Sequence, residues 1–377
     1  MINIYYWSPF ISNIATPKAV INSAISLEKY SKNKFKPTII SLFKEWDNFN
    51  YDIKKYNINI LQLFSKKLNF NFPEKGFFQS RISFILISLI SFFPLFFLLK
   101  KKKPNYFIIH LNTTLPLILL LLFNFDTKFI LRISGKPKLH IFRKILWKFA
   151  AKKLYKVTTP TNGIAEELIN SQIFDKSKIH VLYDPVIHIN KITRQKKNNK
   201  IDKNTFIAIG RLTRQKNFLF LIKSFNIILK RNDKLKLYIL GEGDERDKIQ
   251  NLINKYNLNT NIFLEGYQKN IDKYLKQAHC FILTSLWEDP GFVIIESAIN
   301  NTLILSSNCE TGPKEILKDK INSFVFKSND VDSFIKKFNQ MYFTNENKKF
   351  QMKVLMKKEI KKFTLFDHYN NLISLFK

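Results

Sequence analysis

The sequence contains little cysteine, glycine or acidic side chain, with 2 cysteines, 9 glycines and 29 acids among 377 residues. Cys280 and Cys309 lie in apolar runs without metal-ligand spacing, which argues against a disulfide framework and predicts reduced core thiols in a cytosolic protein. The segment Met1–Pro9 lacks a charged stretch followed by an apolar one. No signal peptide is therefore predicted, and this segment is expected to form a buried first strand.

Arginine is also scarce, although the formal net charge is +33: the 62 cationic residues comprise 54 lysines and 8 arginines. Abundant Lys, Asn, Ile and Phe are what a codon bias toward A and T would produce. Nucleic-acid readers use arginine forks and interleaved aromatics, and the chain has no recognition motif, so we expect no nucleic-acid partner. Residues 100–156 hold 14 Lys or Arg and one acid, Asp126. This basic stretch suits an anionic membrane surface or a lipid-diphosphate acceptor.

Short apolar runs alternate with longer helical stretches, which predicts the α/β class with parallel, doubly wound sheets. The length allows two domains with full cores. The polar run Asn190–Asn204 is the expected linker, and the alternation restarts at Phe206. Strands of the first half are expected at Ile2–Tyr6, Thr38–Phe43, Tyr106–His110, Lys128–Ile133 and Val157–Pro160. Later strands are expected near Lys236, Asn261, Cys280, Leu303 and Ser323.

One apolar stretch, Ile82–Leu99, has no charge and is bounded by Arg81 and Lys100–Lys103. Its length meets the lower threshold for a membrane-spanning helix. A span would place the expected strands Ile2–Tyr6 and Tyr106–His110 of one sheet on opposite sides of the membrane. We therefore expect a helix on or partly in the inner leaflet, with 82–103 contacting anionic headgroups. A wholly buried core helix is the main alternative, and a true span is a further one.

Two glutamates, Glu288 and Glu296, lie eight positions apart around a Pro-Gly break that opens an apolar helix near Gly291. A helix N-terminus presents unpaired N–H groups and partial positive charge, which suit a phosphate. One carboxylate could contact sugar hydroxyls on one side of a bound diphosphate while the other acts on the opposite side, as a nucleotide-sugar would require. The spacing alone also fits an ordinary strand-to-helix turn.

Three apolar strands upstream each end in a glycine. They read Gly210-Arg211-Leu with Lys216 beyond it, then Gly241-Glu-Gly243, and Glu-Gly266-Tyr267. With Glu288 and Glu296, this ordered set resembles the large retaining glycosyltransferase family of GT-B architecture, which builds lipopolysaccharide, capsule and other glycans. The resemblance covers about residues 203–330. The segment Glu288-Asp-Pro-Gly-Phe is similar to a variant in members that act on surface polysaccharides.

The resemblance implies two Rossmann-like domains facing a cleft. Residues 1–189 would bind the acceptor and 203–361 the nucleotide-sugar donor, with a C-terminal helix at about 362–377 packing back on the first domain. The implied function is transfer of a sugar from a nucleotide-diphosphate sugar to a lipid-linked or lipopolysaccharide acceptor, by a cytoplasmic protein peripheral on the inner face of the plasma membrane. The alternatives are a soluble transferase with a small acceptor, and a non-catalytic basic protein that binds membrane or nucleic acid.

Glycosyl transfer from such a donor builds negative charge on the leaving phosphate, so fixed cations and N–H dipoles are required near it. Arg211 and Lys216, behind Gly210, are the candidate cations. The expected dipoles are the amides of Gly291, Phe292 and Val293. The resemblance implies that Glu296 binds the ribose hydroxyls, Glu288 contacts the transferred sugar and Tyr267 lines the base pocket.

The segment Asp330-Val-Asp332 is an Asp-x-Asp motif, whose paired carboxylates could hold a divalent metal ion. It precedes a helical stretch, so an N-cap and a first-turn acid explain it, and no metal or other cofactor is expected.

The acceptor side is less specified, because relatives often carry paired glycines after the first strand and this chain has none there. Side chains of Ser8, Asn13 or Thr16 are the expected substitutes. Strand ends supply three further acceptor-side candidates, His110, Arg132 and Ser134, and packing alone explains a strand-end histidine equally well.

Overall fold

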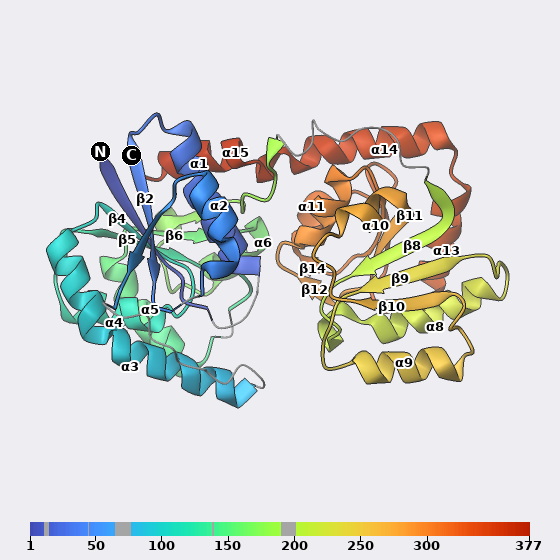
Figure 1. Cartoon of the computed structure of the whole chain (residues 1–377), viewed down its shortest axis with the longest axis horizontal. Coiled ribbons are helices and arrows are strands. Elements are labelled where there is room, and N and C mark those ends of the chain that lie inside the picture. The colour runs from blue at the N-terminus through green and yellow to red at the C-terminus, as the bar shows by residue number, and fades with distance from the viewer. Residues whose placement is uncertain (11–14, 44, 65–76, 138, 190–200) are drawn as a thin grey trace. The chain divides into compact units, whose positions relative to one another are not determined.

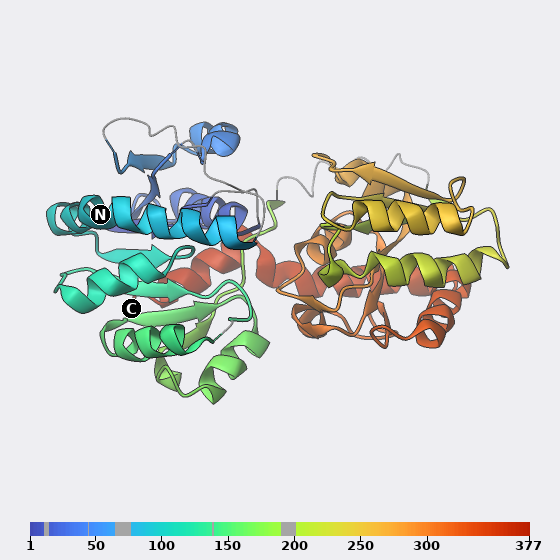
Figure 2. The same ribbon diagram turned by 90° about the horizontal axis from the view of Figure 1, so that it is seen from below.

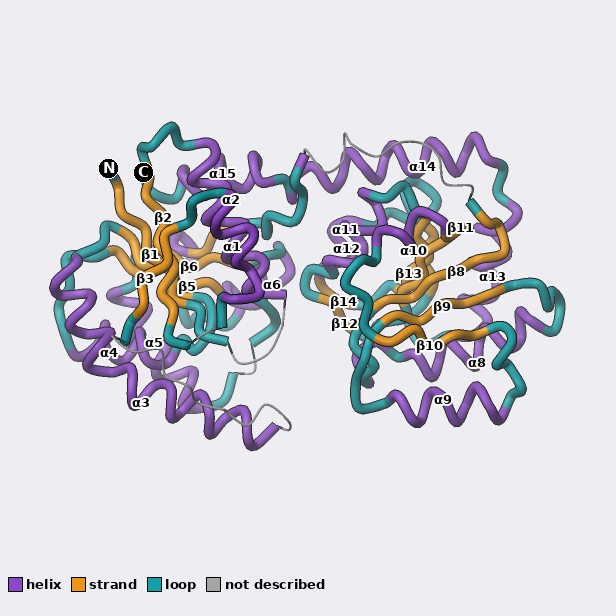
Figure 3. The backbone as a smooth tube through the Cα atoms, viewed as in Figure 1, coloured by secondary structure: helices purple, strands orange, loops and turns teal. Residues whose placement is uncertain are grey.

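The computed structural model describes residues 1–377 except 11–14, 44, 65–76, 138 and 190–200. The chain folds as two units, one formed by Met1–Val186 with Phe363–Lys377 and the other by Ile187–Lys362 (Figure 1). Each unit has its own parallel sheet between helices, so the predicted α/β class is confirmed (Figure 3). Asn13 and most of the expected linker lie outside the described residues.

The first unit contains a 7-stranded sheet in the order β3-β2-β1-β4-β5-β6-β7. Its strands are β1 (Ile2–Trp7), β2 (Phe35–Ser41), β3 (Asn59–Gln62), β4 (Tyr106–Ile109), β5 (Lys128–Arg132), β6 (Lys156–Thr159) and β7 (Ile179–Val181). All neighbouring strands pair in parallel. Strands β3 and β7 were not predicted from the sequence, since these short edge strands are only partly buried and lack an apolar run.

Helices cover both faces of this sheet, because successive strand residues point to opposite sides. On β1, Tyr5 and Trp7 join one core and Ile4 and Tyr6 join the other. The first core packs under α3 (Phe77–Lys102), α4 (Thr114–Leu122), α5 (Ile141–Lys153) and α6 (Asn162–Asn170) (Figure 2). The second packs under α1 (Ala15–Tyr30) and the C-terminal α15 (Leu365–Ser374), with α2 (Asn50–Lys55) at its margin.

The second unit contains a 6-stranded sheet in the order β10-β9-β8-β11-β13-β15. Its strands are β8 (Asp202–Ile209), β9 (Lys236–Leu240), β10 (Ile262–Gly266), β11 (Ala278–Leu283), β13 (Leu303–Ser307) and β15 (Phe324–Phe326). A small sheet pairs β12 (Trp287–Glu288) with β14 (Glu310–Thr311). The helices are α8 (Phe218–Leu229), α9 (Arg246–Lys255), α10 (Asp272–Gln277), α11 (Phe292–Ile299), α12 (Gly312–Ile316), α13 (Val331–Phe343) and α14 (Glu346–Glu359).

The predicted linker Asn190–Asn204 was too long at its end, because β8 begins at Asp202. The Asp202 carboxylate accepts hydrogen bonds from the amide of Asn204 (2.9 Å) and the hydroxyl of Thr205 (2.6 Å). The strand therefore starts with an exposed polar segment, which resembles a linker in sequence.

Strand order reverses once in each sheet, between β1 and β4 in the first unit and between β8 and β11 in the second. In open parallel sheets, ligands bind outside the carboxyl ends of the strands at this switch point. The residues that follow these four strands are therefore the first to consider as functional.

Helix α3 is not wholly buried. One row at four-residue spacing is buried at 0–1% exposure: Ser83, Ile87, Ser91, Leu95 and Leu99. The opposite face exposes large apolar side chains, including Leu89 (67%), Phe93 (65%) and Phe97 (62%). By length and composition Ile82–Lys102 could cross a membrane, with 28% of the apolar window buried in the protein. The exposed apolar face of α3 excludes the alternative of a wholly buried core helix.

Candidate active site

Lys216 and Glu288 form an ion pair at the switch point of the second unit. Lys216 ends the 3₁₀ turn Arg214–Lys216 after β8, and Glu288 lies in β12 after β11. Their side chains are 12% and 7% exposed. The Ser285 hydroxyl donates to the same Glu288 oxygen at 2.6 Å. An ion pair so shielded from water holds both side chains in one geometry.

Three hydrogen bonds join the two loops that carry this pair. The amide of Leu286 donates to the carbonyl of Gln215 (2.8 Å), and the Thr284 hydroxyl donates to the carbonyl of Lys216 (2.9 Å). The Gln215 side-chain amide donates to the carbonyl of Trp287 (2.9 Å). The position of Lys216 is thus fixed by the backbone of the neighbouring strand's loop.

Gly210 and Gly241, at the ends of β8 and β9, are required by close approach. A Cβ on Gly241 would lie 1.9 Å from the Gly210 carbonyl oxygen. A Cβ on Gly210 would lie 2.7 Å from Cε of Lys216. Gly241 therefore leaves room for the Gly210 carbonyl, and Gly210 leaves room for the lysine side chain that reaches Glu288.

The N-terminus of α11 follows Glu288. Gly291, at φ 86°, is the N-cap in a left-handed conformation that glycine adopts without strain, and no side chain caps the helix. The first N–H groups of a helix have no acceptor within it, so the amides of Phe292 and Val293 carry partial positive charge. The Thr311 hydroxyl donates to the Glu288 carbonyl and holds the preceding loop.

The remaining donor-side candidates lie near strand ends or on α11 and are not part of the Lys216–Glu288 pair. Arg211 directly follows Gly210 and its side chain is exposed. Glu296 lies on α11, one turn after Phe292, and is partly exposed. Tyr267 follows β10, which is separated from β8 by β9, and is 75% exposed. Gly210, Lys216 and Glu288 are therefore the predicted residues that direct contacts bring together.

Sequence reasoning missed Thr284, Ser285, Gln215 and Thr311, which hold the ion pair. A usable signal existed for two of them, because Thr284 and Ser285 are polar residues directly after the apolar strand β11. Polar residues at the carboxyl end of a buried parallel strand point to a site. Gln215 and Thr311 act through contacts distant in sequence.

In the first unit, His110, Arg132 and Ser134 line one pocket of 370 Å³ at the ends of β4 and β5. His110 is 8% exposed, and its Nδ1 has no hydrogen-bond partner among the described residues. Burial, followed by the positive charge of Arg132, holds the pKa of His110 well below 6.5, so the ring is neutral. The buried hydroxyl of Ser8, after β1, also has no partner within the described part of the chain. Thr16 lies half-buried in α1.

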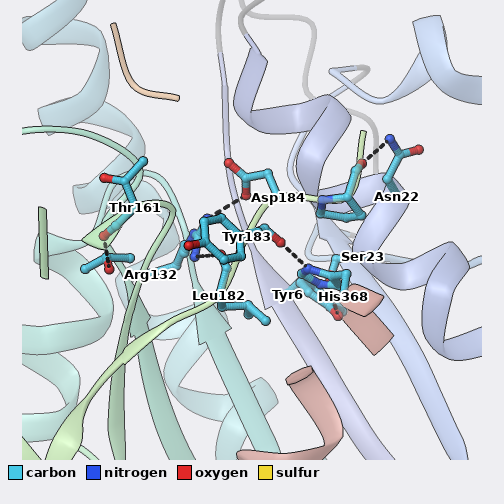
Figure 4. Close-up of polar contacts among 11 residues, drawn as sticks. Tyr6, Asn22, Ser23, Arg132, Thr161, Leu182, Tyr183, Asp184 and His368 are labelled. Atoms are coloured by element: carbon cyan, nitrogen blue, oxygen red, sulfur yellow. Dashed lines mark hydrogen bonds and ion pairs between the residues drawn. The ribbon is translucent and has the colours of Figure 1, made fainter. Parts of the chain in front are cut away.

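Arg132 is committed to the protein itself. Its guanidinium donates to the Asp184 carboxylate and to the Leu182 carbonyl, each at 2.6 Å (Figure 4). The side chain of Arg132 is 2% exposed. The ion pair fixes the segment after β7 against the end of β5.

A second buried chain of hydrogen bonds anchors α15 to α1 and to the segment after β7 (Figure 4). Nδ1 of His368 lies 2.7 Å from the Tyr183 carbonyl, which can only accept, so this nitrogen carries the proton. Nε2 must then accept from the Ser23 hydroxyl at 2.8 Å, and Tyr6 donates to Ser23 at 3.0 Å. Burial lowers the pKa of His368 to about 3, consistent with this neutral tautomer.

The Asp-x-Asp segment has a structural role, because the Asp330 carboxylate accepts from the Ser333 amide at 2.9 Å and caps α13. Both cysteines, Cys280 and Cys309, are free and buried. Within the described ranges, no group of three or more His, Cys, Asp or Glu could hold a metal ion.

Residues 190–358 match the family model for glycosyl transferases group 1. The chain carries a glycosyl transferases group 1 domain. It is 36% identical over 250 residues to an uncharacterized glycosyltransferase of Methanocaldococcus jannaschii, covering 60% of this chain and 61% of that protein. It is 29% identical over 277 residues to the UDP-Gal:alpha-D-GlcNAc-diphosphoundecaprenol alpha-1,3-galactosyltransferase of Escherichia coli, covering 66% and 68%.

The glycosyltransferase fold extends over the whole chain. Anabaena HepE, solved in complex with UDP-glucose, matches with a TM-score of 0.70 at 12% identity, covering 100% of this chain and 99% of that one. The two parallel-sheet units are thus of the GT-B type, which confirms the predicted fold. The match to the first relative spans less than two thirds of its length.

Proposed function

We propose that the chain is a retaining, metal-independent glycosyltransferase that moves a sugar from a nucleotide-diphosphate sugar to a lipid-linked or lipopolysaccharide acceptor. The observation that carries this proposal is the Lys216–Glu288 ion pair at the β8/β11 switch point, next to the uncapped start of α11. A fixed cation beside helix amides is what stabilisation of a leaving diphosphate requires.

The proposed reaction breaks the bond between the anomeric carbon and the diphosphate oxygen. It forms a bond from that carbon to an acceptor hydroxyl oxygen on the same face, and the hydroxyl proton passes to the departing diphosphate. An ammonium group has three N–H donors, so Lys216 can keep its bond to Glu288 and still donate to a phosphate oxygen. Arg211 adds a second cation from the same loop. Glu296 would bind the ribose hydroxyls, and Glu288 would contact the transferred sugar.

A lipid-linked acceptor is supported by the printed name of the Escherichia coli relative, which acts on a sugar carried by diphosphoundecaprenol. It is also supported by Ser8 and His110, whose buried polar atoms lie at the β1/β4 switch point of the first unit. A ligand hydroxyl there would complete their hydrogen bonds.

Peripheral membrane binding through α3 is part of the proposal. The exposed apolar face of α3 precedes Lys100–Lys103, and Lys100, Lys101 and Lys102 occupy its last turn. An apolar helix face flanked by lysines suits the boundary between acyl chains and anionic headgroups. The protein would then work on the cytoplasmic face of the membrane, where a lipid-linked acceptor is presented.

The test is hydrolysis and transfer by the purified chain with a panel of nucleotide-sugars, each with and without a bacterial lipid extract. Donor hydrolysis with lipid-dependent transfer is expected. Transfer to free saccharides at the same rate without lipid would favour a soluble transferase with a small acceptor. If the protein hydrolyses none of the donors and none of them raises its melting temperature, a non-catalytic protein would be favoured.

A further inference from the structure

A pocket of 470 Å³ lies between α8 and α13 in the second unit, and its lining residues fall within 227–235 and 335–343. Both helices run from the carboxyl ends of the strands back to the amino ends, because α8 follows β8 and α13 follows β15. Leu235, directly before β9, is part of the lining. The pocket therefore lies at the opposite end of the sheet from Lys216 and Glu288.

The walls of this pocket are apolar and aromatic. On α13 the rings of Phe338 and Tyr342 stack, with centroids 6.0 Å apart and planes 10° apart. Phe338 and Ile228 are buried in the core of the unit, so folding itself holds the walls in place. Ile227 and Phe343 also line the pocket and are 37% and 79% exposed. A preformed apolar hollow bordered by exposed apolar side chains is typical of a small-molecule site.

Among the described residues that line the pocket, Arg231 alone is charged. Its side chain is exposed, and within the described part of the chain no hydrogen bond or ion pair engages the guanidinium. The turn that carries it, Lys230-Arg-Asn-Asp-Lys234, holds three cations and one acid. The side-chain amides of Asn232 and Asn339 also line the pocket. A guanidinium binds a carboxylate through two parallel hydrogen bonds, and neutral amides supply further donors beside it.

These features restrict the chemistry of the ligand. A cation would be repelled by Arg231, and the hydroxyls of a sugar or nucleotide would lack partners against the aromatic wall. We propose that the pocket binds an aliphatic carboxylate of medium chain length, with its carboxylate on Arg231 and its chain against Phe338, Tyr342 and Phe343. The pocket volume falls within the usual range of small-molecule sites, about 300–1,000 Å³. This ligand site goes beyond the proposed sugar transfer and does not depend on it.

Calorimetric titration of the full chain with decanoate tests the proposal, and one saturable site is expected. Arg231→Gln should weaken binding about tenfold, because one charge-assisted contact is lost. The matched control is Lys230→Gln, which removes the same charge from an exposed neighbour outside the lining. This control should bind decanoate as the wild type does.

A second pair of variants tests the apolar wall. Phe343→Ser removes a ring that lines the pocket and should weaken decanoate binding severalfold, because apolar contact with the chain is lost. Phe350→Ser, at a position 68% exposed on α14 and outside the lining, should leave binding unchanged. Both side chains are exposed, so both variants should fold, and urea midpoints equal to that of the wild type check this.

Two ligands of altered chemistry complete the test. Butyrate keeps the carboxylate but lacks most of the chain, and decyltrimethylammonium reverses the charge. Each should bind at least about tenfold more weakly than decanoate. Equal affinities for decanoate and decyltrimethylammonium would overturn the role of Arg231. Equal effects within either pair of variants would overturn the pocket assignment, and uptake that does not saturate would show adsorption to exposed apolar surface instead of a site.

Discussion

Lys216→Ala should impair both stability and activity, and the structure allows the two effects to be separated. The Glu288 carboxylate is 7% exposed and accepts from Lys216 and Ser285. Removing the lysine leaves the buried Glu288 carboxylate with one side-chain donor among the described residues, the Ser285 hydroxyl. Breaking a buried pair in this way costs about 3 kcal/mol, which would lower the urea midpoint by about 1 M.

The double variant Lys216→Ala/Glu288→Gln should recover most of the lost stability. A neutral glutamine at position 288 can still accept from Ser285 and carries no uncompensated charge. Transfer should remain about a hundredfold below wild type, because a positioned cation at the leaving group is worth about 3 kcal/mol in the transition state. The control is Lys223→Ala on the exposed face of α8, which should change neither quantity.

Urea unfolding followed by circular dichroism measures the first effect, and initial rates of transfer measure the second. Two results would refute the reasoning. Unchanged stability of Lys216→Ala would mean that Glu288 is not left uncompensated. Recovery of transfer together with stability in the double variant would mean that Lys216 is a structural residue.

Four further outcomes follow from the same structure. Glu296→Ala should lower kcat/KM about a hundredfold. The urea midpoint should not change, because this side chain is partly exposed. Near-native turnover of the variant would exclude Glu296 from the donor site. Replacing Lys100–Lys103 with Gln should shift the protein from the membrane pellet to the supernatant at low salt, because each lysine contributes about 1 kcal/mol of headgroup attraction. Retention of the wild-type protein in the pellet through high salt and carbonate would contradict peripheral binding. Transfer should survive EDTA, and a loss restored by Mg²⁺ would make Asp330 and Asp332 candidate metal ligands. The pKa of His368 is about 3 in the folded protein against 6.5 for an exposed histidine, so the unfolded chain binds a proton first as pH falls. His368 alone should therefore cost about 2 kcal/mol of stability between pH 7 and pH 5, and His368→Gln should remove that share of the slope in urea titrations.

The Lys216–Glu288 ion pair was more predictable from sequence than the buried contacts of the first unit, for a physical reason. At Gly210 the strand end, the glycine and Lys216 all lie within one short segment, and the steric need for glycine is local. The partner Glu288 was found because it precedes a helix start marked by Gly291. These features are set by backbone conformation over a few residues, so a single sequence contains them.

The polar contacts of the first unit depend instead on distant segments of the chain. The Arg132–Asp184 pair joins residues 52 apart, and the His368–Ser23 bond joins residues 345 apart. No local sequence pattern predicts either contact. The expected strand at Val157–Pro160 was found because it is buried, whereas the edge strand β7 was missed because its residues are only partly buried.

The commitment of Arg132 changes what its position means. From sequence, an arginine at a strand end is a candidate phosphate ligand. Here its two terminal nitrogens donate to the Asp184 carboxylate and the Leu182 carbonyl inside the protein. Its charge is therefore compensated by Asp184 within the protein. Arg132 lines the pocket and holds the segment after β7, and its positive charge adds to burial, the larger cause, in lowering the pKa of His110.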